Sequence, residues 1–197
     1  MIFFTADEHY GHKNIIKYCG RPFDSVKEMN KVLISNHNAV VKETDTTIHA
    51  GDFCLYRDLV DALNIIQQLS GKHIFIGGSH DAWLTTTRQR VLPFTVGEQI
   101  FTHIIDGQVI VVCHYAMRTW PRSHYGSWQL HGHSHGKLEP IGKQLDVGVD
   151  NNDYYPVGFD EIKGIMAKRP DNPGLIINSN DISEVSLNLK PFDKTNS

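Results

Sequence analysis

The sequence has only three cysteines, no long apolar run and no excess of positive charge, and each shortage excludes a class of protein. Cys19, Cys54 and Cys113 are an odd number with no Cys-x-x-Cys pair, which argues against a disulfide framework and favours a reducing compartment. No stretch approaches the roughly 20 apolar residues that a membrane-spanning helix needs. The net charge of −3 provides no broad basic field for nonspecific binding of nucleic acid, which leaves a local basic pocket as the way in which nucleic acid could still bind.

The N-terminal residues lack the basic segment and the extended apolar core of a signal peptide. We therefore expect a cytoplasmic protein that does not associate with membranes. A length of 197 residues and a hydrophobic fraction of 40% are typical of one globular domain. No repeat or linker divides the chain, so we expect a single domain over residues 1–190 and a frayed tail over residues 191–197. The sequence leaves the oligomeric state open.

The hydrophobic pattern predicts strands and helices in alternation early in the chain and mainly strands later. Ser25 and Glu28 form a capping box that opens the first helix, and Asp106-Gly107 between two apolar runs predicts a hairpin. This order predicts an α/β fold with parallel strands first and hairpins later. The expected strands are 2–6, 46–49, 73–76, 100–105, 109–113, a short strand from 130, 145–149 and 185–189; the expected helices are 25–41, 58–69 and 159–168.

Residues that bind metals or carry protons follow closely after several of these strands. They are Asp7, Asp52, His80, His114 and His133. In open α/β sheets, ligand sites form beyond the carboxyl ends of the strands, so these side chains are expected to converge. Several of the patterns are weak alone, because a Gly-Asp pair is usually a turn and a lone histidine after an apolar run is usually buried. The most specific single string is Gly132-His133-Ser134-His135. The ordered set, however, favours a two-metal hydrolytic site.

The spacing within the set suits metal ligation. Asp7 and His9 lie two residues apart on an extended segment, so both side chains point to one side and can bind one ion. His133 and His135 have the same spacing after a glycine. A carboxylate such as Asp52 can bridge two ions with its two oxygens. Carboxylate and imidazole ligands suit Mn²⁺, Fe or Zn²⁺, and the mixed set does not choose among them. We expect two divalent ions, Mn²⁺ first, with Fe, Zn²⁺ or Ni²⁺ as alternatives.

Taken in order, these strings resemble the pattern of the calcineurin-like metallophosphoesterases, which is D-x-H, G-D, G-N-H-D/E, H and G-H-x-H. The resemblance covers residues 7–150, and the wider string through Arg21-Pro22-Phe23 is similar to a group of small phage and bacterial phosphoesterases. It implies a four-layer α/β/β/α sandwich with a dinuclear metal site at the C-terminal ends of the strands.

The resemblance also implies a role for each matching residue. His80 matches the family's catalytic histidine, and Asp81 could either orient it or cap a helix. Ser79 stands where the family has an asparagine that binds the second metal, so the ligand at this position departs from the pattern. The implied metal ligands are Asp7, His9 and His135 for one ion, His114, His133 and Ser79 for the other, and Asp52 between the two.

The implied function is a metal-dependent phosphoesterase in which a hydroxide bridging the metals attacks the phosphate ester. We expect a phosphodiesterase acting on a nucleotide or another small diester. The alternatives are a phosphomonoesterase or protein phosphatase, and a catalytically impaired metal-binding scaffold, which Ser79 alone supports. The protein phosphatase branch carries G-D-x-V-D-R-G, which residues 51–57 do not match.

Further polar residues near these strings could contact substrate. An arginine fork suits phosphate, and Trp120 could stack on a base. The alternative for each is a solvated loop residue, and Asp150 could orient a ligand or form a turn. The candidate substrate-binding residues are His12, Asn14, Arg21, Arg118 and Arg122.

Overall fold

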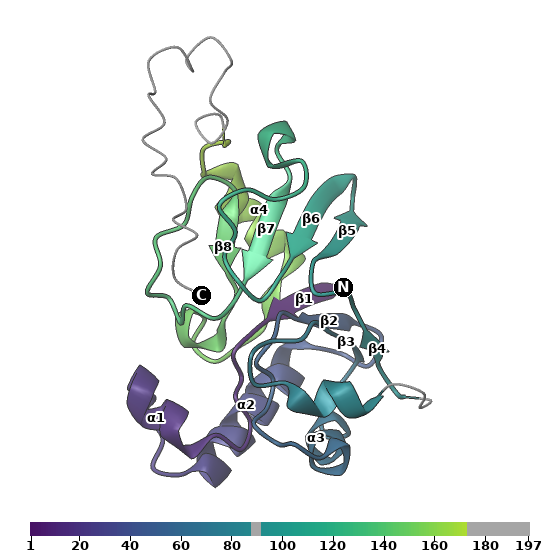
Figure 1. Cartoon of the computed structure of the whole chain (residues 1–197), viewed down its shortest axis with the longest axis vertical. Helices are drawn as coiled ribbons and strands as arrows, with labels where there is room; N and C mark the ends of the chain where they lie inside the picture. Colours follow the sequence, from purple (N-terminus) through teal and green to yellow (C-terminus); the bar gives the residue numbers. More distant parts are fainter. Residues whose placement is uncertain (88–91, 173–197) are drawn as a thin grey trace, which may run out of the picture.

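The computed structural model describes residues 1–87 and 92–172. Within these residues the chain forms two β-sheets and four α-helices, which confirms the predicted α/β class (Figure 1). No helix in this part of the chain has the length and apolar character needed to cross a membrane. The helices are α1 (Lys13–Cys19), α2 (Val26–Val40), α3 (Leu59–Ile66) and α4 (Phe159–Ala167).

The first sheet has the strand order β4-β3-β2-β1-β9. Its first four strands are parallel, and β9 is antiparallel to β1. Thr5, His49 and Phe75 lie at one level of the register, so the segments after β1, β2 and β3 leave the sheet at the same edge. The strands are β1 (Ile2–Thr5), β2 (Thr46–His49), β3 (Lys72–Phe75), β4 (Thr95–Val96) and β9 (Val157–Gly158).

The second sheet has the strand order β5-β6-β7-β8. The hairpin at Asp106-Gly107 joins β5 and β6 as predicted, but β6, β7 and β8 are parallel, so the expectation of further hairpins is wrong. The connections over 113–127 and 132–143 are long enough for the crossovers that parallel strands need. The strands are β5 (Phe101–Ile105), β6 (Gln108–Val112), β7 (Trp128–His131) and β8 (Gln144–Asp146).

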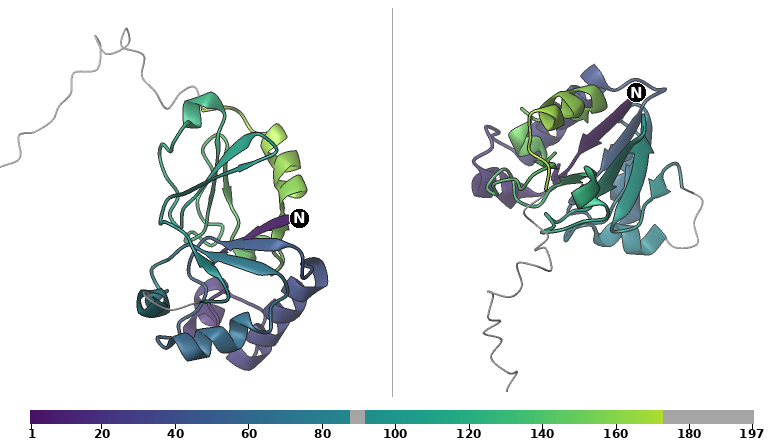
Figure 2. Two further views of the ribbon diagram at one scale, coloured as in Figure 1. Left: turned by 90° about the vertical axis from the view of Figure 1, so that its right-hand side faces the viewer. Right: turned by 90° about the horizontal axis from the view of Figure 1, so that it is seen from above.

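A shared hydrophobic core joins the two sheets and α4. Figure 2 shows the arrangement of these elements in two further views. Ile48 and Ile76 from the region of the first sheet are fully buried with Ile110 and Leu130 of the second. The opposite face of the first sheet packs against α2 and α3, where alternate strand residues such as Phe75 join a second core. Both faces of the first sheet are therefore packed, one against the second sheet and the other against α2 and α3.

Helix α2 begins as the capping box predicts, and α1 was not predicted. Ser25 Oγ accepts the Glu28 N–H at 3.2 Å, and Glu28 in turn accepts the N–H of Asp24 at 2.8 Å. Helix α1 is short, has no side-chain cap at His12 and buries only Ile15, so its sequence carries no helical signal. The predicted strand at 185–189 and the tail over 191–197 lie outside the described residues.

Candidate metal centre

The segments that follow β1 and β2 run side by side into the site. The Asp7 N–H donates to the Gly51 carbonyl at 3.0 Å, and the His9 N–H donates to the Asp52 carbonyl at 3.0 Å. This pairing continues the parallel ladder of β1 and β2 past the ends of the strands. It fixes Asp7, His9 and Asp52 at one edge of the first sheet.

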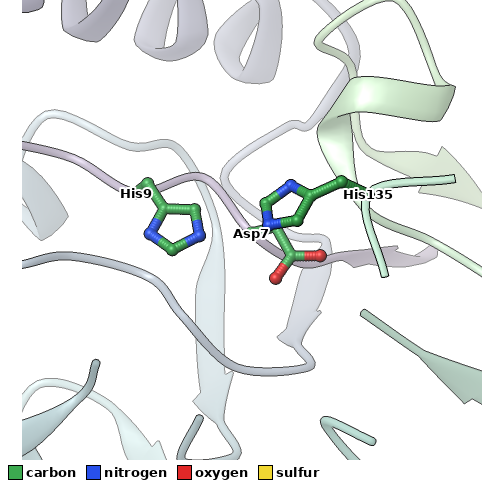
Figure 3. A group of neighbouring side chains, drawn as sticks. All are labelled: Asp7, His9 and His135. Atoms are coloured by element: carbon green, nitrogen blue, oxygen red, sulfur yellow. The ribbon is translucent and has the colours of Figure 1, made fainter. Parts of the chain in front are cut away.

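The loop after β7 meets this edge from the second sheet. The His133 N–H donates to both carboxylate oxygens of Asp7, at 3.0 and 2.8 Å. Asp7, His9 and His135 form the first ligand group, in which one ligand atom of each lies within 4.8 Å of the others. Figure 3 shows these three side chains gathered at one point, two from the segment after β1 and one from the loop after β7.

A second ligand group lies beside the first. It consists of Asp52, His114 and His133, whose ligand atoms also lie within 4.8 Å of one another. His114 Nε2 lies 3.4 Å from Asp52 Oδ2, and His9 Nε2 lies 3.7 Å from the same oxygen. One carboxylate oxygen of Asp52 thus faces an imidazole of each group, and all six residues come from the positions that the sequence predicted.

Two of the ligand histidines have a buried ring nitrogen without a hydrogen-bond partner among the described residues, which fits a role in metal binding. His9 Nε2 and His114 Nε2 are buried and have no hydrogen-bond partner in the described part of the chain. The Ala50 carbonyl can only accept, so His114 Nδ1, 3.0 Å away, is the donor and Nε2 is the ring nitrogen that faces Asp52 and could bind an ion. His135 Nδ1 lies 2.7 Å from Asp150, which leaves its Nε2 available as well. Neutral imidazoles and carboxylates in this arrangement are a donor set for divalent ions.

The backbone at the candidate ligands is strained. Five of the six have left-handed φ angles, a conformation that costs non-glycine residues roughly 1–2 kcal/mol each. Strain of this kind persists only where surrounding contacts enforce it, and it concentrates at functional sites. The residues and angles are Asp7 (59°), His9 (55°), Asp52 (55°), His133 (69°) and His135 (47°).

Two glycines allow the ligand loops to approach one another. A Cβ on Gly78 would lie 2.3 Å from Asp52 Oδ1, and one on Gly132 would lie 2.6 Å from the Ala6 Cβ and 2.7 Å from Asp7 Oδ2. Neither position tolerates a side chain without moving a ligand. The glycines of the two motifs are therefore needed for space at the carboxylates.

Ser79 and His80 both contact Asp52. The Ser79 hydroxyl donates to Asp52 Oδ2 at 3.1 Å, and the His80 N–H donates to Oδ1 at 2.8 Å. The imidazole of His80 is 40% exposed, and its Nε2 lies 4.0 Å from Asp52 Oδ2. His80 is thus a partly exposed imidazole beside the ligand groups, where it can reach a bound molecule, and its ligand atom also lies within 4.8 Å of those of His9 and Asp52.

Asp81 does not take the orienting role, one of the two roles that the sequence left open for it, because its carboxylate does not contact the imidazole of His80 among the described residues. Its carboxylate is buried and accepts backbone N–H groups from Asp52 at 2.7 Å and Gly78 at 2.9 Å, together with the Trp83 indole at 3.0 Å. It also accepts the N–H groups that follow Asp52. Asp81 therefore holds the loop that carries Asp52 and does not act on the proton of His80.

Arg21 is also placed differently from the prediction. Its guanidinium is fully buried, forms a bidentate pair with Asp150 at 2.8 Å for both contacts, and donates to the carbonyls of Asp7 at 2.7 Å and Glu8 at 3.0 Å. Asp150 in turn accepts from His135 Nδ1. Arg21 cannot line the mouth of the site, because it is a buried brace between two residues of the first ligand group.

Burial and neighbouring charges set the protonation of the carboxylates and imidazoles. Burial raises the pKa of Asp7 to about 7, and it lowers the pKa of His9 to about 2, which keeps this imidazole neutral. Burial also works against the charged form of Asp52, but the neighbouring His114 side chain and the His80 N–H lower the pKa of Asp52 overall. A cation between the groups would favour the charged form of Asp7 as well.

A cleft of about 390 Å³ opens over the two ligand groups. It is lined by predicted residues such as His12 and Asn14, and also by Tyr18 and Lys137, which sequence reasoning missed. Tyr18 lies on the unpredicted α1, and Lys137 follows the last ligand in an irregular loop, so neither had a recognisable signal.

The remaining substrate predictions are not supported. Arg118 and Arg122 are exposed but do not line the cleft. Trp120 is buried, and its indole N–H donates to the Ser127 carbonyl at 3.2 Å, so it offers no free face for a base.

A chain of buried polar side chains lies beneath the site. Glu8, between two ligands in sequence, contacts His49 Nδ1 at 2.6 Å, and His49 Nε2 contacts His73 Nδ1 at 3.1 Å. Burial lowers the pKa of both histidines to about 3 and raises the pKa of Glu8. These residues tie the Asp7–His9 segment to β2 and β3.

Two other proteins are similar to this chain along most of its length. The uncharacterized protein MJ1445 of Methanocaldococcus jannaschii is 32% identical over 175 residues, which cover 85% of this chain and 92% of that protein. The crystal structure of AQ665, a protein of unknown function from Aquifex aeolicus, matches with a TM-score of 0.64 and 23% identity over 84% of this chain and 98% of that one, which shows a shared fold. The chain matches no family model. Because the identity to MJ1445 extends over nearly the whole of both proteins, the chain belongs to the same family as MJ1445.

Proposed function

We propose that this protein is a dinuclear metal-dependent phosphoesterase of the calcineurin-like type, with its sheets and helices in the α/β/β/α order of that family. One observation carries the proposal: two ligand groups of three residues lie side by side, with an oxygen of Asp52 facing an imidazole of each. Paired sites of this composition suit hydrolysis of phosphate esters.

The first ion would be held by Asp7, His9 and His135, and the second by His114 and His133, with Asp52 between them. Two such ions supply a nucleophile at neutral pH and neutralise the charge of the phosphoryl group. The protein contributes the positions of the ligands, which the paired segments and left-handed backbone fix before any substrate binds.

His80 would act as the general acid. Its imidazole is 40% exposed, lies with Nε2 4.0 Å from Asp52 Oδ2, and lines the cleft. From this position it can donate a proton to the leaving oxygen of an ester bound over the ligand groups. Its own N–H to Asp52 fixes the backbone from which the imidazole projects.

The cleft favours a diester over a monoester. Among its lining residues Lys137 is the only lysine or arginine, within the part of the chain that the structure describes. A monoester dianion carries one more negative charge than a diester and gains more from arginine forks, which this cleft lacks. The alternatives are a phosphomonoesterase or protein phosphatase, and an impaired scaffold, which the replacement of the family's asparagine by Ser79 supports.

The proposal can be tested with the diester bis(4-nitrophenyl) phosphate and the monoester 4-nitrophenyl phosphate. Hydrolysis of each is measured once with chelator and once with added Mn²⁺. We expect Mn²⁺-dependent release of nitrophenol with the diester preferred, loss of this activity in His114→Ala, and retention in His103→Ala, a histidine of β5 outside the site. Preference for the monoester would favour the phosphatase alternative. Unchanged activity after thorough chelation, or no hydrolysis with Mn²⁺, Zn²⁺, Fe²⁺ or Ni²⁺, would refute it.

A further inference from the structure

An exposed tyrosine borders the first ligand group. Tyr18, on α1, has 64% of its surface exposed and lines the cleft. Its ring lies edge-on to His12, with centroids 6.4 Å apart, and the His12 ring lies 5.2 Å from that of His9. Leaving a large aromatic ring in solvent at the wall of a polar cleft gains nothing for folding.

A second exposed tyrosine borders the second ligand group. Tyr115 directly follows His114 and is 48% exposed. Its ring packs edge-on against His133 at 4.7 Å and against His114 at 4.9 Å. Tyr115 is not itself in the cleft lining, but His133, on which it packs, is. Tyr115 comes from the connection after β6, whereas Tyr18 comes from α1, so separate parts of the fold place one exposed ring beside each ligand group.

Exposure of a tyrosine alone does not produce this placement. Tyr125 is more exposed, at 76%, but its ring packs on His124, which belongs to neither ligand group. Tyr18 and Tyr115 each reach the ligand histidines directly or through one ring. Together they flank the place where a phosphoryl group would bind.

A phosphodiester has two substituents, which extend from the phosphorus in different directions. Exposed aromatic rings are surfaces on which nucleobases stack, whatever the base. From the two rings, one beside each ligand group, we propose that the substrate is a phosphodiester joining two nucleosides, with one base on Tyr18 and the other on Tyr115. This inference rests on the proposed phosphodiesterase function and specifies its substrate class.

The charge of the protein favours a short substrate. The net charge is −3, and Lys137 is the lone lysine or arginine in the described cleft lining. A long nucleic acid would gain affinity from a basic track along its backbone. A dinucleotide needs only the phosphoryl site and the two rings, and a cleft of about 390 Å³ lies within the usual range for small-molecule sites.

The test compares hydrolysis of the dinucleoside monophosphate dTpdT with that of glycerophosphoethanolamine, a diester with no ring, in the Mn²⁺-loaded protein. The variants are Tyr18→Leu, Tyr115→Leu and the corresponding Tyr→Phe changes, with Tyr125→Leu as the matched control. We expect each site Tyr→Leu change to lower kcat/KM for dTpdT by roughly 5- to 150-fold, while the Tyr→Phe changes and Tyr125→Leu stay within about twofold. Calorimetric binding of dTpdT in a His80→Ala background should weaken by the same factors.

The outcomes separate this inference from the proposed function. Equal losses on both diesters, no loss on dTpdT, or no preference for dTpdT over glycerophosphoethanolamine would overturn the assignment of the two rings. A higher rate per linkage on a single-stranded 12-mer than on dTpdT would overturn the short-substrate assignment. Failure on dTpdT with retained hydrolysis of bis(4-nitrophenyl) phosphate would refute this inference alone. Failure on every diester would refute the proposed function with it.

Discussion

Arg21 offers the sharpest test of how the protein holds the first ligand group. Its buried guanidinium donates twice to Asp150 and once each to the carbonyls of Asp7 and Glu8. Asp150 holds the Nδ1–H of His135 at 2.7 Å, so one side chain braces the segments that carry Asp7 and His135. Arg21→Met keeps much of the side-chain volume and removes all four of these hydrogen bonds.

The expected cost is large because the pair is buried. Removing one partner of a buried ion pair typically destabilises a protein by roughly 3–5 kcal/mol, and here two carbonyls also lose their donor. Burial opposes the charged form of Asp150, but hydrogen bonds and charges from His135 and Arg21 lower its pKa to about 2. Losing the brace behind a ligand histidine should also weaken metal binding by roughly 10- to 100-fold.

Urea unfolding in the presence of chelator measures the first effect, and calorimetric Mn²⁺ titration measures the second. Arg21→Lys keeps the charge without the planar fork and should fall between the wild type and Arg21→Met. Arg118→Met, at an exposed arginine, is the control and should change the unfolding free energy by less than about 0.5 kcal/mol. An Arg21→Met protein within about 1 kcal/mol of the wild type and with unchanged metal affinity would show that the brace does not have the role assigned here.

The other predictions concern ligand identity, acid catalysis and pH. Ser79→Asn should raise the affinity of the second site for metal and raise activity at limiting Mn²⁺. The reason is that an amide oxygen on a longer side chain is a better ligand than a hydroxyl that donates to Asp52. Identical metal titration curves for the variant and the wild type would contradict this. His80→Ala should keep its metal and lose roughly 10²- to 10⁴-fold in rate, whereas Asp52→Asn should lose both metal and rate. Elemental analysis together with kinetics distinguishes the two variants. Equal metal loss in both would show that the assignment of His80 as acid and Asp52 as metal ligand is wrong. Burial lowers the pKa of His37 from 6.5 to about 4. Between these two pH values the native state binds fewer protons than the unfolded chain, so the protein loses stability as the pH falls from 6.5 to about 4. His37→Phe should remove about 3 kcal/mol of this acid dependence, measured as the difference between urea unfolding curves of the two proteins at pH 7 and pH 4.

The positions of the candidate ligands could be predicted because each depends on a local rule. A strand can be recognised from its apolar run, and the polar residues just past Thr5, His49 and Val112 must leave the sheets at their carboxyl ends. The order of the motifs along the chain then indicated that these residues, with His133 and His135, form one metal site. The two ligand groups therefore contain six of the seven ligands that the sequence selected, all except Ser79.

The supporting residues could not be predicted, because their roles depend on depth and partners that the sequence does not encode locally. Arg21 looks like a phosphate-binding residue until its distant partner Asp150 is in place. Asp81 looks like a partner for the adjacent His80, yet the turn directs it into the loop of Asp52. Tyr18 was missed because α1 has no cap and buries only one side chain.

Anomalous diffraction at the manganese edge, from crystals grown with Mn²⁺, tests the central claim most directly. Two peaks are expected in each molecule, one among Asp7, His9 and His135 and the other among Asp52, His114 and His133. A single peak, or peaks away from these side chains while both ligand groups remain without metal at saturating Mn²⁺, would contradict the dinuclear centre on which the proposed function rests.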